Sequence, residues 1–389
     1  MRHRSIFLPL LIIFLVLSLA NAGLAILIAS HLALTPIEER LLQASAFLFF
    51  ALQMIAPCIQ MFTRKGFSPN KFWEILNWYS CVALGALSTM VVTAVALELP
   101  LAIAIQFYPK LQTHSLFHVI WIAVFGTIAF ATLTIGVAQA NVGPKIKKVH
   151  VPIQGLPKSF DGYRIVQISD LHVSALIGRR YTQKVVNTIN SLDADIVALT
   201  GDFVDGSVDQ LRYRIAPLAD IKHKDGRYFV TGNHEYYHDA LEWIDEHRRL
   251  GNQVLLNEHK LISRGDDKIA VAGTIDRAGK YFIKEHKEDI SKAIEGLEPE
   301  IIKVLLAHHP NCHDEAAAKG IHLQLSGHTH GGQFFPWQAI VRLVHTHYNG
   351  LSKQRSMWIY VNPGTGFWGP PIRTTIPAEV TLLILKAVA

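Results

Sequence analysis

Residues 163–172 read Tyr-Arg-Ile-Val-Gln-Ile-Ser-Asp-Leu-His, a short β-branched run that ends in a carboxylate and an imidazole. The run predicts a buried strand, and Asp170 and His172 come directly after it. The same arrangement recurs four times further along the chain. The five predicted strands cover residues 163–168, 195–199, 227–230, 302–306 and 322–325.

Each of these strands is followed within a few residues by side chains that bind metal ions. Loops at the carboxyl ends of adjacent strands converge in α/β folds, so groups that are far apart in sequence can meet in one crevice. Glycines in these loops permit the tight turns that present ligands. The five clusters are Asp170-Leu-His172, Gly201-Asp-Phe-Val-Asp205, Gly232-Asn-His-Glu235, His308-His-Pro310 and Gly327-His-Thr-His330.

The chemistry of these clusters fits hydrolysis of a phosphate ester. A mixed set of carboxylates, imidazoles and an amide oxygen, without thiolates, suits Mn, Fe or Zn. Two such ions, about 3.5–4 Å apart, neutralise phosphoryl oxygens, generate hydroxide near neutral pH and stabilise the leaving oxygen. A structural zinc site would more often show cysteines at fixed spacing. We therefore predict a binuclear metal site.

The pattern around the clusters predicts an α/β domain. Helical stretches at 180–192 and 240–250 lie between predicted strands. The last apolar runs, at 358–361 and 379–385, read as strands without intervening helices, which favours two sheets.

The ordered set Asp-x-His, Gly-Asp-x-x-Asp, Gly-Asn-His-Glu, His-x-Pro and Gly-His-x-His resembles the calcineurin-like metallophosphoesterase superfamily over nearly all of the soluble half. The closer resemblance is to its membrane-associated branch, with YkuE-like phosphodiesterases and transmembrane metallophosphoesterase-domain proteins. Two stretches carry it: Gly327-His-Thr-His-Gly-Gly-Gln333 and Gly364-Thr-Gly-Phe-Trp-Gly-Pro370. The resemblance implies a four-layer α/β/β/α sandwich.

The resemblance also implies a role for each matching residue. His234 would contact the phosphate and assist the leaving group, with Asp205 orienting its imidazole and raising its basicity. Asp202 would bridge two metal ions. The first ion would also bind Asp170, His172 and His330, and the second would also bind Asn233, His308 and His328.

Several neighbouring residues remain open from the sequence. His309 takes no motif position and is expected to be a neighbour of the site. Asp276 could reach the site or could cap a turn. The stretch 334–337, Phe-Phe-Pro-Trp, could face a lipid or belong to the core. Other histidines are expected at surface, interface or packing positions: His31, His114, His118, His223, His238 and His247.

Four apolar runs in the first part of the chain are long enough to cross about 30 Å of hydrocarbon as helices. They lie at 6–32, 41–62, 78–97 and 116–140. The third run continues into 99–107, where Pro100 predicts a break or an interfacial segment. An alternative for the first run is a cleaved signal peptide, because residues 20–22, Ala-Asn-Ala, resemble a cleavage site. The apolar character continues past this point, which favours an all-α transmembrane domain of four helices.

Basic residues in the short connections predict the orientation of these helices. One side of a four-span arrangement would carry only Arg40 and Lys110, so the other side, with the N-terminus and the soluble domain, is expected in the cytoplasm. The lysines and arginines that give the chain its net charge of +6 are scattered and do not form a basic stripe with interleaved aromatic residues. Nucleic acid is therefore not expected as a partner. The basic residues expected inside are Arg2, Arg4, Arg64, Lys65, Lys71, Lys145, Lys147 and Lys148.

We therefore predict a transmembrane anchor over residues 1–148 and a metallophosphoesterase domain over 149–389. The chain is expected to be an integral membrane protein that hydrolyses phosphoester or pyrophosphate bonds, with a lipid-linked phosphate as a natural substrate because enzyme and lipid share one surface. One rival is a non-catalytic scaffold or sensor at the membrane, which should have lost ligands. Another is a regulated transporter, against which the sparse intramembrane charge speaks.

Overall fold

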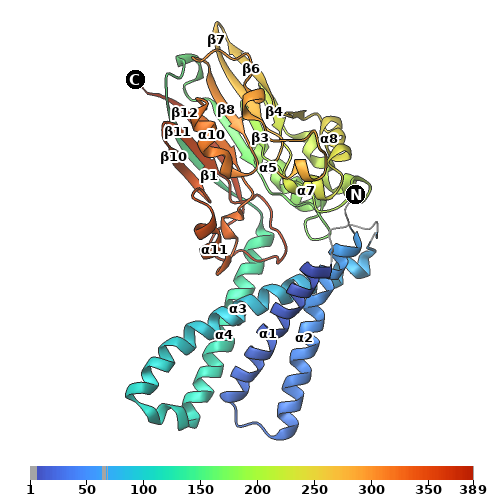
Figure 1. Cartoon of the computed structure of the whole chain (residues 1–389), viewed down its shortest axis with the longest axis vertical. Coiled ribbons are helices and arrows are strands. Elements are labelled where there is room, and N and C mark those ends of the chain that lie inside the picture. Colours follow the sequence, from blue (N-terminus) through green and yellow to red (C-terminus); the bar gives the residue numbers. More distant parts are fainter. Residues whose placement is uncertain (1–6, 64–66, 68, 389) are drawn as a thin grey trace. The chain divides into compact units, whose positions relative to one another are not determined.

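Four long apolar helices form the first part of the chain in the computed structural model, which describes residues 7–63, 67 and 69–388 (Figure 1). The shortest helix has 24 residues and, at about 1.5 Å per residue, exceeds the roughly 30 Å of bilayer hydrocarbon. The predicted runs are confirmed as helices with the length and apolar composition to cross a membrane. They are α1 (Phe7–Ser30), α2 (Pro36–Thr63), α3 (Lys71–Phe107) and α4 (Ser115–Val142).

Pro100 lies inside α3, which continues without interruption for 37 residues. The predicted break at Pro100 is therefore wrong, whereas the alternative, an interfacial segment, stays a prediction. A proline removes one backbone hydrogen bond, but in a membrane helix neighbouring groups and small local adjustments can satisfy the carbonyl that is freed. The 99–107 run is an extension of the third helix.

Buried polar contacts connect the first three helices. The Asn21 amide donates to Gln53 Oε1 at 2.8 Å, and the Ser80 hydroxyl donates to the Gln53 carbonyl at 3.2 Å. In a hydrocarbon environment the apolar surface alone does not drive helices together, so hydrogen bonds and close packing specify the contact. These polar side chains therefore serve helix association.

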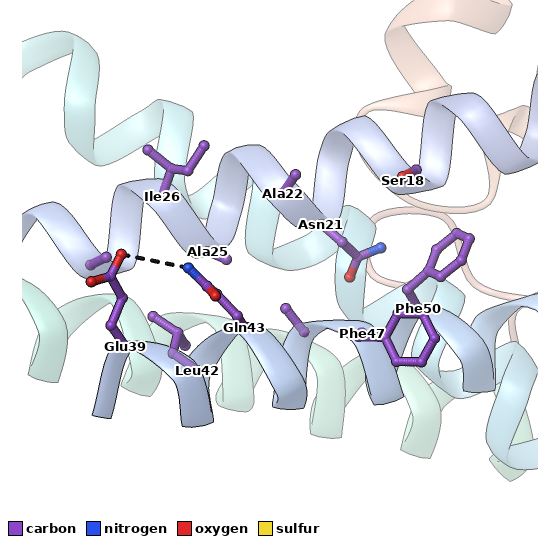
Figure 2. Close-up of a pocket in the computed structure, with 12 residues that line it drawn as sticks. Ser18, Asn21, Ala22, Ala25, Ile26, Glu39, Leu42, Gln43, Phe47 and Phe50 are labelled. Atoms are coloured by element: carbon purple, nitrogen blue, oxygen red, sulfur yellow. Dashed lines mark hydrogen bonds between the residues drawn. The ribbon is translucent and has the colours of Figure 1, made fainter. Parts of the chain in front are cut away.

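A groove of about 440 Å³ runs between α1 and α2 (Figure 2). Small side chains of α1, such as Ala22 and Ala25, leave the space open. At one end Gln43 donates to Glu39 at 3.5 Å, and Phe50 lies toward the other end. The two helices are therefore not closely packed along this stretch.

Contacts divide the chain into two units, residues 1–138 with 369–374, and residues 139–368 with 375–389. The short segment 369–374 thus belongs with the apolar helices. Glycines on α3 and α4 make room for its Ile372, because a Cβ on Gly85 would lie 2.0 Å from Ile372 Cδ1 and a Cβ on Gly136 would lie 2.5 Å from Ile372 Cγ2. Arg373 N donates to the Gly136 carbonyl at 3.0 Å.

The second unit contains two six-stranded sheets. Each sheet contains four neighbouring parallel strands, which cover residues 164–168, 196–199, 226–229 and 253–254 in the first and 267–273, 302–306, 323–326 and 357–361 in the second. The first sheet has the order β1 (Lys145–Gln154), β12 (Glu379–Val388), β2 (Arg164–Ile168), β3 (Ile196–Leu199), β4 (Gly226–Phe229), β5 (Gln253–Val254). The second has the order β10 (Gly350–Gln354), β11 (Met357–Val361), β9 (Leu323–Ser326), β8 (Ile302–Leu306), β7 (Asp267–Gly273), β6 (Glu258–Arg264).

Side chains from alternating positions of each sheet fill three separate apolar layers. Ile165, Ile196 and Leu325 belong to the layer between the sheets. Val197 belongs to the layer under α5 (Arg179–Asn190), α6 (Val208–Ile215) and α8 (Ala240–Arg249), and Leu305 to the layer under α9 (Ile290–Ala293) and α10 (His313–Ala318). The helices therefore cover the outer faces of both sheets (Figure 1), which confirms the predicted four-layer α/β/β/α arrangement.

Strand β1 is the longest of the strands that were not predicted from the sequence, which also include β5, β6 and β10. It begins three residues after α4 ends and pairs in parallel with β12 over ten residues, from Lys145 opposite Glu379 to Gln154 opposite Val388. Lys145, Lys147 and Lys148 therefore lie on this strand. Four other residues of the orientation prediction, Arg2, Arg4, Arg64 and Lys65, lie outside the described residues.

Candidate metal centre

The predicted site residues all follow the carboxyl ends of parallel strands. Asp170 and His172 come after β2, Asp202 and Asp205 after β3, and Asn233 begins α7 (Asn233–Tyr237) after β4. From the second sheet, β8 leads to His308, and β9 leads to His328 and His330. The two sheets thus contribute to one cluster, in which contacts connect all nine predicted side chains.

Several of these residues adopt a left-handed backbone conformation. The positive φ angles are 52° at Asp170, 50° at His172, 56° at Asp202, 71° at His328 and 51° at His330. Such angles are costly for residues with a Cβ and persist where the surrounding structure requires them, often at functional sites. The strand-end loops therefore turn sharply to bring these side chains together.

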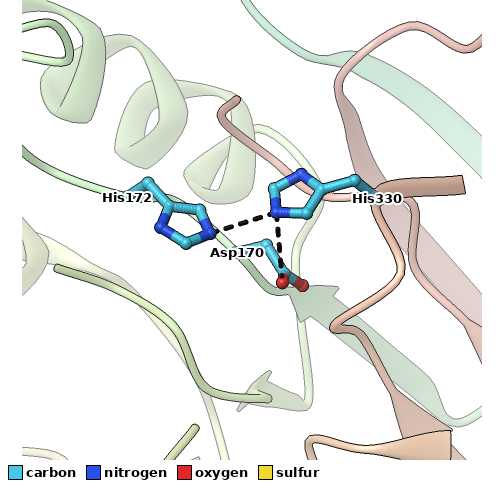
Figure 3. A group of neighbouring side chains, drawn as sticks. All are labelled: Asp170, His172 and His330. Atoms are coloured by element: carbon cyan, nitrogen blue, oxygen red, sulfur yellow. Dashed lines mark hydrogen bonds and ion pairs between the residues drawn. The ribbon is translucent and has the colours of Figure 1, made fainter. Parts of the chain in front are cut away.

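Asp170, His172 and His330 form the first group that could hold a metal ion (Figure 3). His172 Nε2 lies 3.0 Å from His330 Nε2, which in turn lies 3.5 Å from Asp170 Oδ1. The Nδ1 of His172 faces Asp205 Oδ2 at 3.1 Å. An ionised carboxylate can only accept a hydrogen bond, so His172 Nδ1 carries the proton and donates a hydrogen bond to Asp205. His172 Nε2 is then unprotonated and offers its lone pair toward the group.

Asp202, His308 and His328 form the second group. His308 Nδ1 donates to the Thr200 carbonyl at 2.7 Å, which directs Nε2 toward Asp202 Oδ2 at 3.1 Å. Among the described residues this buried Nε2 has no partner in hydrogen-bond geometry. Asn233 joins the group, because its Oδ1 lies 3.0 Å from His328 Nδ1.

Electrostatics around the second group favour a bound cation. Burial lowers the pKa of His308, but the Asp202 carboxylate raises it well above its ordinary value. Burial likewise raises the pKa of Asp202, whereas His308 and His234 hold it well below the usual range. The carboxylate is therefore ionised, and His308 Nε2 takes a proton or, in competition with it, a metal ion.

His234 and Asp205 lie together beside both groups. Asp205 accepts a short hydrogen bond from His234 Nδ1 through Oδ1 and one from His172 through Oδ2. Burial lowers the pKa of His234, but the Asp202 and Asp205 carboxylates raise it to about 9. The other ring nitrogen, Nε2, lies 4.0 Å from Asp202 Oδ2. The imidazole is thus oriented with Nε2 toward the second group.

Glu235 has a positioning role that the sequence did not reveal. The residue is fully buried, and its carboxylate accepts from the backbone N–H groups of Asp202 at 3.0 Å, Phe203 at 2.7 Å and Gly232 at 2.7 Å. It therefore ties the loop after β3 to the loop after β4. Glu235 belongs to the Gly-Asn-His-Glu motif, which drew attention to it. The motif does not distinguish a metal ligand from a residue that holds two loops together.

Two other neighbours are placed by their local contacts. Asp276 caps a turn, because its Oδ1 accepts from Ala278 N at 2.7 Å, and it is absent from the ligand groups of the described residues. His309 lies beside the site, with its ring centroid 4.2 Å from that of His328. His247 is buried and stacks on Phe229 with 3.6 Å between ring centroids, as expected for a packing residue.

Glycines allow the loop after β4 and the loop after β9 to approach the acidic ligands Asp202 and Asp170 closely. A Cβ on Gly327 would lie 1.9 Å from Ser169 Oγ and 2.2 Å from Asp170 Oδ2. A Cβ on Gly232 would lie 2.2 Å from Asp202 Oδ1. Since real contacts of this kind do not occur at such distances, a side chain at either position would displace a carboxylate.

We expect Gly327→Ala to weaken metal binding at least about tenfold, because the added methyl group moves Asp170 and the His328 backbone that donates to it at 3.0 Å. Titration of the purified full-length protein with Mn²⁺ measures this. Gly178→Ala is the matched control, since a Cβ there meets nothing within 4 Å. Equal metal affinity in both variants would show that the approach at Gly327 does not position the ligands.

The residues present fit divalent metal ions. Carboxylate oxygens and imidazole nitrogens are hard to borderline donors, and the second shell, Asp205 on His172 and the Thr200 carbonyl on His308, fixes the ring tautomers as in established metal sites. The buried His308 Nε2 lies 3.1 Å from Asp202 Oδ2 without hydrogen-bond geometry, so both atoms are placed to share a cation.

Comparison with known proteins agrees with this geometry. The family model described as calcineurin-like phosphoesterase matches residues 163–332. A Danio rerio protein named "Transmembrane protein with metallophosphoesterase domain" is 36% identical over 272 residues, 68% of this chain and 62% of that protein. The match therefore spans less than two thirds of that relative.

Two bacterial relatives are matched over most of their length. An uncharacterized metallophosphoesterase from Aquifex aeolicus is 31% identical over 244 residues, 62% of this chain and 92% of that protein. The Bacillus subtilis metallophosphoesterase YkuE, also described as uncharacterized, is 30% identical over 243 residues, 60% of this chain and 82% of that protein. The shared region thus makes up most of the length of these two relatives.

Proposed function

Because the chain belongs to the calcineurin-like metallophosphoesterase family, we propose that it is a membrane-anchored hydrolase of phosphoester or pyrophosphate bonds that uses two metal ions. The observation that carries the proposal is the pair of ligand groups, each of which draws residues from both sheets, beside the His234 and Asp205 pair. When bound, two ions would supply charge neutralisation for the phosphoryl oxygens and an activated water.

The protein's own residues would hold the metal ions in place and protonate the leaving group. Asp170, His172 and His330 would hold one ion, and Asn233, His308 and His328 the other, with Asp202 bridging. His234 Nδ1 donates a hydrogen bond to Asp205, so Nε2 is the ring nitrogen that would donate its proton to the leaving oxygen. Asp205 would keep the ring in this orientation and favour its protonated form.

Membrane attachment supports a lipid-linked phosphate as the substrate. Four helices with the length and composition of membrane spans precede the catalytic unit. An enzyme and a lipid confined to one surface meet at a high effective concentration, so modest intrinsic affinity suffices.

We expect prolonged treatment with a chelator to reduce hydrolysis of a generic aryl phosphodiester at least about a hundredfold, and added Mn²⁺ to restore it, because the charge on the phosphoryl oxygens would otherwise stay uncompensated. The purified full-length protein in detergent serves for this assay, with metal content measured in parallel. About two ions per chain and recovery by Mn²⁺ support the proposal. A chain without metal affinity would instead fit a non-catalytic scaffold.

We also propose that the catalytic unit faces the cytoplasm. Among the described residues, Lys71, Lys145, Lys147 and Lys148 lie on the side predicted to be inside, against Arg40 and Lys110 on the other. A cysteine introduced at the exposed Tyr213 should react with an impermeant maleimide only in inside-out vesicles. Reaction of this cysteine in intact cells would show that the catalytic unit faces the outside.

A further inference from the structure

An apolar helix face is exposed beside the metal centre. Helix α11 (Trp337–Val344) follows the loop that carries His330, and none of its eight described residues is buried. The exposed fractions are large: 50% for Phe335, 50% for Trp337, 44% for Ile340, 87% for Leu343 and 65% for Val344. We refer to these five side chains as the α11 face. Five large apolar groups exposed within ten residues indicate a surface that contacts something other than water.

The charge of the sequence segment that contains the helix narrows the choice of partner. Residues 328–368 contain no Asp or Glu, whereas Arg342, Lys353 and Arg355 are basic. Short amphipathic helices with Trp, Phe and Leu on one face and basic residues nearby bind the interfacial region of membranes, and anionic lipids strengthen the binding. The composition of α11 and the segment around it therefore favours an anionic bilayer surface.

The bilayer is also the apolar surface that lies nearest to the catalytic unit when the four helices span a membrane. Four membrane-spanning helices hold the catalytic unit to the membrane, so the cost of bringing the α11 face to the lipid is already offset by the anchor. Trp and Phe at the entry of α11 are the aromatic residues that prefer the headgroup level. Phe335 and Trp337 belong to the stretch that the sequence left open between a lipid-facing role and the core, whereas Phe334 is buried.

Both ends of α11 are joined to the metal centre. At its start, Gly332 has a φ of 80°, and a Cβ there would lie 2.2 Å from Gln338 Cα, so the helix packs directly on the loop after His330. At its end, the His345 ring lies 6.0 Å from the His328 ring and 5.5 Å from the His309 ring, centroid to centroid. His345 Nδ1 also lies 3.2 Å from Asn311 Oδ1. A surface that binds α11 therefore comes close to the second ligand group.

We propose that the α11 face docks on the bilayer surface and presents the metal centre to the phosphate of a lipid headgroup. The docking stands on the exposed face and on the basic composition of the segment that contains it. The headgroup as substrate rests on the phosphoesterase function proposed above.

Docking is tested by a nitroxide label at Leu343→Cys in the full chain, with the three native cysteines replaced, reconstituted in vesicles of phosphatidylcholine and phosphatidylglycerol. Leu343 is 87% exposed, so the label should not disturb packing. We expect several-fold higher collision with oxygen relative to a water-soluble nickel chelate than for a label at Tyr213→Cys, which is 73% exposed on α6. Equal values at the two positions overturn the docking. A label at Leu343 shielded from both reagents indicates a protein partner, such as a second copy, and overturns it as well.

The substrate part is tested by activity on two kinds of substrate. The double variant Trp337→Glu with Leu343→Glu should hydrolyse phosphatidic acid or a polyprenyl pyrophosphate in vesicles about tenfold more slowly than the unaltered chain, while a water-soluble aryl phosphodiester is hydrolysed at the same rate. Tyr213→Glu is the surface control. Equal rates on vesicle lipid, or an unaltered chain that hydrolyses only the soluble ester, overturn the substrate part. Loss of both activities in the unaltered chain would instead overturn the phosphoesterase function, and the label would still report whether α11 docks.

Discussion

Asp202→Ala is expected to lower hydrolysis of an aryl phosphodiester by about a thousandfold. Asp202 is the predicted bridge, it lies 3.1 Å from His308 Nε2, and its Oδ1 also accepts from His234 N at 2.8 Å. Loss of the shared carboxylate would remove several kcal/mol of charge stabilisation, and about 4 kcal/mol corresponds to three factors of ten in rate. Steady-state rates at saturating Mn²⁺, with bound metal counted in the same preparation, measure the effect.

The matched control is Asp245→Asn, because the Asp245 side chain is 77% exposed and its ion pair with Arg248 lies on the surface. It should leave both rate and metal content unchanged. An Asp202→Ala protein that keeps full activity in a contaminant-free preparation would disprove the proposed metal mechanism. One that loses activity but still binds two ions would place Asp202 in a role other than bridging.

His234→Asn is expected to lower the rate by about a hundredfold to ten-thousandfold, the range typical for loss of a general acid. The loss should depend on the leaving group. A p-nitrophenolate leaves readily without a proton, whereas a simple alkoxide needs one, so the variant should suffer much more with an alkyl ester. The measurement is the ratio of the two rates in variant and unaltered protein.

His150→Gln serves as the control for His234, since His150 is exposed on β1. Metal content should remain at two ions in His234→Asn, because the ring is expected to act on the substrate. Equal losses for good and poor leaving groups would argue that His234 binds phosphate without transferring a proton. A drop in metal content would make it a ligand.

Five strands and the convergence of the loops that follow them were predictable because each strand is a short, buried element. Strands Ile196–Leu199 and Ile302–Leu306 are covered on both faces. The first reads as a continuous apolar run, and the second is interrupted only by Lys303. The residues after them must turn away at the sheet edge, and this places Asp202 and His308 together. Local sequence therefore carries enough information to predict the convergence, although the role of each ligand still depends on the family resemblance.

Other features depend on contacts that local sequence does not encode. Strand β1 is mostly exposed along its first residues, and its lysines looked like a connection between units. Glu235 acts through three backbone N–H groups from two loops, which only the folded chain brings to it. The position of His345 beside His328 follows from the path of α11 and from the close approach at Gly332.

The pairing of β1 with β12 has a practical consequence for work on the catalytic half alone. A fragment that begins at Val149 would lack the partners of residues 379–382, because Lys145 to Lys148 lie opposite them. The first four of the ten residues of β12 would then offer unpaired backbone groups along an open edge, the kind of surface that recruits strands from other molecules. Solubility of such a fragment should improve when it starts at Pro144, which keeps the whole of β1.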